Sequence, residues 1–201
     1  MSSEVEIYNL ALAHLGDTAN VASPDESSVQ AELCSRFYPI ARNALLEMPD
    51  CDWNFATRRA TLALLGSDVV AWDYAYAYPS DAVRLISVLA PDAGDDQEIQ
   101  PYALELDSAD RRVIYTDQAE AVVRYIALVE DTTRFSQLFT TTLTWSLASL
   151  LAGPILKGDA GVAEAKRCAS MAAAWLAKAS VSDANQRRGS TPHTPAFLAG
   201  R

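Results

Sequence analysis

Histidines and cysteines are the side chains of this chain with the most obvious chemistry, and both are few. The 201 residues include two histidines and three cysteines. His14 falls in an expected helix and His193 in the C-terminal segment, so a serine or cysteine nucleophile would lack a positioned base. Cys34, Cys51 and Cys168 lie far apart, with no second cysteine at metal-ligand spacing. We therefore expect no catalytic triad, disulfide framework, metal or cofactor, and no glycine-rich phosphate loop points to a nucleotide.

Paired carboxylates are the remaining candidates for catalysis. Asp50 with Asp52, and Glu105 with Asp107, each place two acids on one side of an extended chain. Glycoside hydrolysis needs only two suitably separated carboxyl groups. Such pairs are also expected by coincidence in a chain with 26 acidic residues. The sequence favours a protein that is not an enzyme, and a peptidoglycan or glycan hydrolase stays open as the alternative.

The overall charge restricts the possible partners. The formal net charge is −10, so the field of the protein opposes attraction to phosphate backbones and anionic lipid. Tight DNA binding is not expected, although a surface lining a DNA conduit works well when it repels its cargo. The most apolar stretch, Leu147 to Leu156, is interrupted by Gly153 and Pro154 and is short for a bilayer. We expect neither secretion nor membrane insertion.

Helical periodicity dominates the first quarter of the chain. An apolar pattern predicts a helix from Ile7 that stops at Gly16, a residue suited to a left-handed C-terminus. A second helix should begin with Ser23 as N-cap and Pro24 in its first turn, and end before Pro49. Its predicted apolar face consists of Val29, Leu33, Phe37, Ile40, Ala44, Leu45 and Met48.

Two further helices are expected in the last third. The first runs from Phe135 to about Leu150 and bends or ends at Gly153 and Pro154. The second runs from about residue 159 to about residue 183. Its many alanines permit close approach of a neighbouring helix backbone.

The middle of the chain has the alternation and β-branched content of strands. Proline, glycine, aspartate and serine clusters separate the runs, which predicts an antiparallel sheet with a hairpin connection at 107–110 and an acidic loop at 91–96. The predicted strands are Trp72 to Tyr78, Val83 to Leu89, Tyr102 to Leu106, Val113 to Thr116 and Val122 to Val129. The order of helices, strands and helices indicates an α+β fold.

An aromatic row is the strongest local signal. Trp72, Tyr74, Tyr76 and Tyr78 recur at the strand period, which would place all four rings on one face. Such a row could be a platform on which sugars stack. Aromatic rows on strands more often form a buried sheet face, so we favour a core or subunit contact, with Arg84 beside it.

Several segments together resemble one known family. They are the opening residues 7–16, the segment from Trp53 to Arg59, the aromatic strand, residues 135–151, and the helix positions Ala31, Cys34, Tyr38, Arg42 and Leu46. In this order they resemble the head-to-tail adaptors of short-tailed bacteriophages, the tail tubular protein A family. The similarity spans roughly residues 5–156.

That resemblance implies an architecture and a role. The fold would be a bundle of about four helices, residues 3–48 and 132–184, with an inserted antiparallel β-sheet subdomain at about 53–130, all within one adaptor domain, 1–184. Such proteins form a ring, typically of twelve subunits, between the portal and the tail nozzle, and the genome passes through it. The expected partners are further copies, the portal protein, the nozzle protein and DNA as passing cargo. The location would be the virion tail, after assembly in the bacterial cytoplasm, and no residue would be catalytic.

The C-terminal segment, 185–201, differs in composition from the rest. Gly189, Pro192 and Pro195 disfavour a helix, and we expect the segment to be disordered in isolation. By resemblance it is an extended arm that docks on the portal, with Arg187, Arg188, Phe197 and Leu198 as the contacting residues. An inert tail is the alternative.

Overall fold

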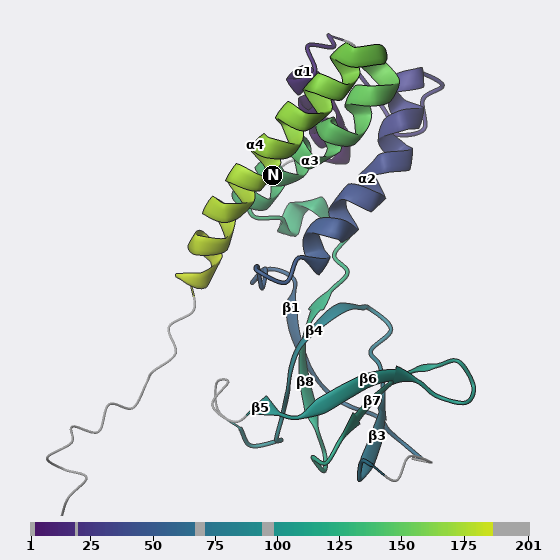
Figure 1. Cartoon of the computed structure of the whole chain (residues 1–201), viewed down its shortest axis with the longest axis vertical. Helices are drawn as coiled ribbons and strands as arrows, with labels where there is room; N and C mark the ends of the chain where they lie inside the picture. The colour runs from purple at the N-terminus through teal and green to yellow at the C-terminus, as the bar shows by residue number, and fades with distance from the viewer. Residues whose placement is uncertain (1–2, 19, 67–70, 94–98, 187–201) are drawn as a thin grey trace, which may run out of the picture.

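The computed structural model describes residues 3–18, 20–66, 71–93 and 99–186, and it is an α+β fold, as the sequence predicts. A helical bundle occupies one end of the long axis and a β region, residues 57–127, the other (Figure 1). The bundle consists of α1 (Glu4–His14), α2 (Val29–Glu47), α3 (Gln137–Leu156) and α4 (Gly158–Ala184), and a short 3-10 helix, Thr132–Arg134, precedes α3.

The first two helices are delimited by serine caps and a glycine. Ser3 Oγ accepts the N–H of Glu6 at 3.2 Å, and Gly16 has the left-handed φ of +74° predicted for the end of α1. The predicted cap of α2 is wrong, because Ser28 caps it by accepting the N–H of Ala31 at 3.2 Å. The carboxylate of Glu26 accepts the N–H of Ala22 at 2.7 Å and so stabilises the turn before α2.

The buried face of α2 also differs from the predicted apolar stripe. The residues that face the core are Ala31, Cys34, Tyr38, Ala41, Arg42, Leu45 and Leu46. Val29 is 68% exposed and Ile40 55% exposed. The smaller face is buried because Ala31 and Cys34 admit close packing, and because Tyr38 meets the edge of Tyr8 with ring centroids 5.5 Å apart. Of the predicted stripe, Leu45 is buried and Leu33 and Phe37 are half-buried against the core, whereas Val29, Ile40, Ala44 and Met48 are exposed.

Helices α3 and α4 form a tight antiparallel hairpin. Helix α3 continues through Gly153 and Pro154 to Leu156, so it does not end at the predicted position. Lys157, with φ of 56°, then reverses the chain. A Cβ atom on Gly161 would lie 2.9 Å from the carbonyl oxygen of Ala152, which confirms the close approach that the alanine-rich sequence permits.

Among the described residues, α3 is long and apolar enough to cross a membrane by length and composition, which corrects the length argument made from the sequence. Half of that stretch is buried inside the molecule. The core helix of a water-soluble protein can have the same length and composition. Phe139, Leu143, Leu147 and Leu151 are fully buried in the helical core, so packing against the other helices accounts for the apolar character of α3.

The β region contains two four-stranded antiparallel sheets where the sequence predicted one. One sheet has the order β1 (Thr57–Thr61), β8 (Val122–Ala127), β4 (Ala82–Leu89) and β5 (Ile99–Gln100). The other has the order β2 (Leu64–Leu65), β3 (Tyr74–Ala77), β7 (Arg112–Thr116) and β6 (Tyr102–Leu106). The unpredicted strands are β1, β2 and β5. Strand β1 carries two arginines and two threonines without apolar alternation, and β2 and β5 are only two residues long.

The two sheets share a core, and one of them also packs against the helices. Tyr76 and Ile114 of one sheet cluster with Val88 and Val123 of the other. The opposite side of strand β8 places Ile126 in the helical core. The predicted hairpin joins β6 and β7, where Asp107 Oδ1 accepts the N–H groups of Ala109 and Arg111 at 2.8 and 2.9 Å.

Candidate functional site

Three of the four predicted aromatic residues lie on the inner side of their sheet. Tyr74, Tyr76 and Tyr78 pack in or against the core between the sheets, and the rings of Tyr74 and Tyr76 are stacked with centroids 6.1 Å apart. Tyr76 is buried and its hydroxyl donates to the carbonyl of Gln118 at 2.8 Å. The inner rings therefore hold the two sheets together.

Trp72 does not belong to this row. It packs against Ala75, Val113 and Tyr115, which form a separate cluster on the other side of the sheet. Strand β3 begins only at Tyr74, so the strict two-residue alternation does not extend back to position 72. The prediction of four rings on one face is wrong for this residue. A continuous sugar-stacking platform gains no support from this arrangement.

Arg84 lies where the β region meets the helices. Its Nη2 donates to the carbonyl of Cys51 at 3.1 Å and to Asp52 Oδ1 at 2.9 Å. The other carboxylate oxygen of Asp52 lies 3.3 Å from Arg124, which is only 3% exposed. The charge of one carboxylate is thus shared by two guanidinium groups from adjacent strands. This arrangement fixes the segment before β1 against β4 and β8.

The same segment also holds the end of α4. The backbone N–H of Asn54 donates to Asp183 Oδ2 at 2.8 Å, and the side-chain amide of Asn54 donates to the carbonyl of Asp183 at 2.8 Å. Ser180 Oγ donates to the carbonyl of Asp50 at 2.9 Å. Residues 50–54 therefore connect the last helix to the two central strands of one sheet.

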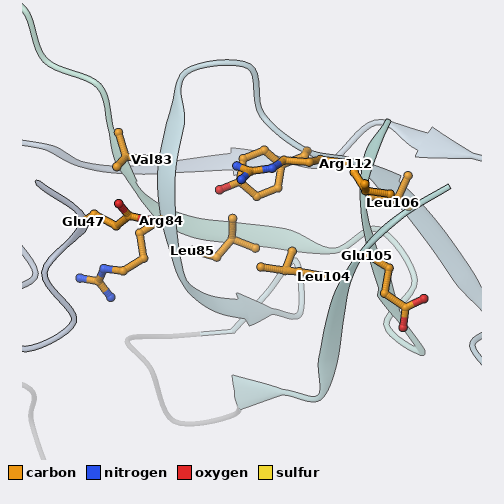
Figure 2. A pocket seen from close by; sticks show the side chains of 10 residues that line it. Glu47, Val83, Arg84, Leu85, Leu104, Glu105, Leu106 and Arg112 are labelled. Carbon is orange, nitrogen blue, oxygen red and sulfur yellow. The ribbon is translucent and has the colours of Figure 1, made fainter. Parts of the chain in front are cut away.

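A groove opens beside Tyr78 and Arg84, and its lining comes from the end of α2 and from strands β4, β6 and β7. Its volume is about 530 Å³. Leu85 and Leu104 lie at its centre, and Arg112 lies over the ring of Tyr78 at 5.2 Å (Figure 2). The other lining residues are Glu47, Val83, Arg84, Glu105, Leu106 and Val113. The groove thus includes two of the predicted contact residues, Tyr78 and Arg84.

The charges around the groove are uneven. Glu47 and Glu105 lie at opposite ends of it (Figure 2), and neither forms an ion pair within the described ranges. Arg84 is paired with Asp52. Burial raises the pKa of the Tyr78 hydroxyl, although the Arg112 guanidinium acts in the opposite direction. The groove is therefore an apolar trough with an acidic residue near each end and with Arg84 and Arg112 along its walls.

The predicted portal-docking residues cannot be placed. Arg187, Arg188, Phe197 and Leu198 lie outside the described residues, which end at Gln186. His193 lies outside them too.

Catalytic alternatives gain no geometric support. His14 stacks on Trp145 with centroids 3.5 Å apart, and burial, followed by Arg167, lowers its pKa. Asp107 holds the hairpin turn, and hydrogen bonds from Arg111 lower the pKa of its carboxyl group, which is the wrong direction for a general acid near neutral pH. Burial raises the pKa values of the thiols of Cys34 and Cys51 to about 12 and about 11. Within the described ranges, no group of three or more histidine, cysteine and acidic side chains could hold a metal.

Comparisons with known proteins do not add a family. No protein-family model matches the sequence, and no curated protein matches it significantly.

Proposed function

We propose that this chain is a structural ring subunit, the head-to-tail adaptor that joins the portal of a short-tailed bacteriophage to its tail nozzle. The observation that carries the proposal is the exposed apolar side of α2. Its exposed members are Val29, Ile40, Ala44 and Met48, and Leu33 and Phe37 lie half-buried beside them against the helical core. Exposed apolar stripes of this length are typical of helices that pack against another subunit.

The position of α4 supports a ring over a two-fold dimer. Helix α3 packs against both α2 and α4, and these two lie on opposite sides of the bundle (Figure 1). The exposed side of α4 is rich in alanine, including Ala169, Ala173 and Ala177. A bulky face on one side and a smooth face on the other favour a head-to-tail contact between copies. Head-to-tail contacts close into rings when the rotation between copies allows it.

The charge fits a conduit for DNA. With a net charge of −10, the ring would carry a large negative charge, and DNA would pass without adhering. Genomic DNA is then cargo, and the specific partners are further copies, the portal protein and the nozzle protein. The resemblance implies twelve subunits, a location in the virion tail and portal docking through the arm, 185–201. No catalytic group or cofactor enters this role.

The test is assembly on the portal. The purified protein is mixed with portal rings of the same phage, and both the mixture and the protein alone are imaged by negative-stain electron microscopy and sized by light scattering. We expect an additional ring of density on one end of the portal. Monomers in the presence and in the absence of portal would contradict the proposal.

A further inference from the structure

The groove beside Tyr78 carries apolar surface that the described part of the chain leaves uncovered. Leu104 is 49% exposed and Leu106 is 62% exposed, although Leu85 in the same groove is buried. Strand β6, which supplies both leucines, pairs with β7 on one side and forms the edge of its sheet. Apolar side chains gathered in an open trough are typical of a docking surface for an extended segment.

A short series of contacts links the end of the described chain to this groove. Asp183, three residues before Gln186, is bonded to Asn54. Asp52, two residues before Asn54, is bonded to Arg84, and Arg84 lines the groove. The arm begins after Gln186. The path from there to the groove consists of two hydrogen-bonded contacts, Asp183 with Asn54 and Asp52 with Arg84, and a few residues of chain.

We propose that the arm of the same chain, residues 187–201, docks in this groove, with Phe197 and Leu198 against Leu85 and Leu104. Phe197 lies 197 − 186 = 11 residues beyond Gln186. Eleven extended residues span up to about 36–40 Å, so reach does not limit docking. Because the arm is tethered, its effective concentration at the groove is on the order of millimolar, and modest contacts suffice.

The two acidic residues at the ends of the groove have the opposite charge to the arm, although Arg84, paired with Asp52, and Arg112, over Tyr78, also line the groove. The arm carries Arg187, Arg188 and Arg201 and no acidic residue. Glu47 and Glu105 stand unpaired at the two ends of the groove within the described ranges. Opposite charges on a short tether favour docking, most strongly at low salt. This inference does not depend on the ring, but under the proposed adaptor role it would make groove and portal competitors for the same arm.

Cysteine trapping tests the docking in the full chain without portal. Leu106→Cys at the rim is combined with Ala199→Cys beside the two anchors, and disulfide formation under mild oxidation is followed by mass and non-reducing gel. The native Cys34, Cys51 and Cys168 are buried, so they compete little. The matched control adds Phe197→Asp and Leu198→Asp to the same pair, which preserves the tether and both thiols.

The expected result is a crosslink within one chain that forms at least about tenfold faster than in the aspartate control, since local docking raises the effective concentration. A second control moves the body cysteine to Leu64→Cys on β2, an equally exposed apolar site at the far edge of the same sheet, and should also crosslink slowly. Equal rates with and without the aspartates would overturn the proposal. A crosslink between two chains would overturn it as well, since it would place the arm in the groove of a neighbour. No portal protein is added in any of these reactions. A negative result therefore bears on docking of the arm and not on ring formation.

Discussion

Asn54 and Asp183, 129 residues apart, form a two-point contact in which the backbone N–H and the side-chain amide of Asn54 each donate to Asp183 at 2.8 Å. One acceptor is the Asp183 carboxylate and the other is its main-chain carbonyl. The contact ties the end of α4 to the segment that enters β1. It therefore sets where the C-terminal arm leaves the body.

Asp183→Asn tests how this contact responds to pH. Burial raises the pKa of Asp183, and the hydrogen bonds from Asn54 only partly oppose this. The folded protein thus binds a proton more readily than the unfolded chain does, so this residue's stability contribution is full below the ordinary carboxyl pKa and is lost as the pH rises through the raised value. Wild type should gain stability relative to the asparagine variant on acidification.

The measurement for Asp183 is urea unfolding of both proteins at about pH 4 and about pH 7, because the difference between them cancels the other acids. An unchanged difference, or a larger advantage of wild type at the higher pH, would contradict the assignment of burial as the dominant cause.

Tyr76 and Trp72 should differ in their contributions to stability. Tyr76 is buried between the sheets, so Tyr76→Ala should cost about 3–5 kcal/mol. Tyr76→Phe, which removes only the hydroxyl bonded to Gln118, should cost about 1–3 kcal/mol. Trp72 is half-buried on the other side of the sheet, and Trp72→Ala should cost less than about 2 kcal/mol. Thermal and urea melts give the order, and an equal loss for the two alanine variants would show that the sheet faces are assigned wrongly.

The elements with a strong period were predictable, and those fixed by tertiary contacts were not. Strand β6 occupies the predicted range, Tyr102–Leu106, and α4 begins and ends within one residue of its prediction. Strand β2 has two residues, too few to show any alternation. Its place depends on pairing with β3, which lies about ten residues further along the chain.

The candidate groove was predictable only in part. The sequence singled out Tyr78 and Arg84, since the aromatic period marks the first and the second follows it closely. Leu104, Leu106 and Arg112 were missed, because they join the groove through sheet order and not through any local pattern.

The buried face of α2 was predicted wrongly for a related reason. The side of α2 that carries Val29 and Ile40 is more hydrophobic than the side that carries Ala31 and Cys34. The side with the smaller residues is nevertheless the buried one, because small side chains allow closer packing.

Gly161 and Gly153 form a matched pair for testing the contact between α3 and α4. A methyl group on Gly161 would meet the backbone of Ala152 at 2.9 Å, so Gly161→Ala should cost about 1–3 kcal/mol through overpacking. A methyl group on Gly153 would meet nothing within 4 Å, so Gly153→Ala should be neutral or gain about 0.5–1 kcal/mol of helix propensity. Unfolding free energies of the two variants decide it. Similar values would mean that the helices are further apart than described.

Ile40→Glu tests the α2 stripe as a subunit contact. Ile40 is exposed in the single chain, so a charge there should change the free energy of unfolding by no more than about 0.5 kcal/mol. In a ring the same carboxylate would be buried against the neighbouring subunit without a partner, and assembly should fail. Leu64→Glu, at an equally exposed apolar site on β2, adds the same charge far from the helices and should assemble as wild type does. Co-sedimentation with portal rings at matched salt compares the three proteins after their melting temperatures have been checked. If Ile40→Glu and wild type bound the portal equally and formed the same ring, the α2 stripe would not be the contact, and the observation that carries the proposed function would be lost.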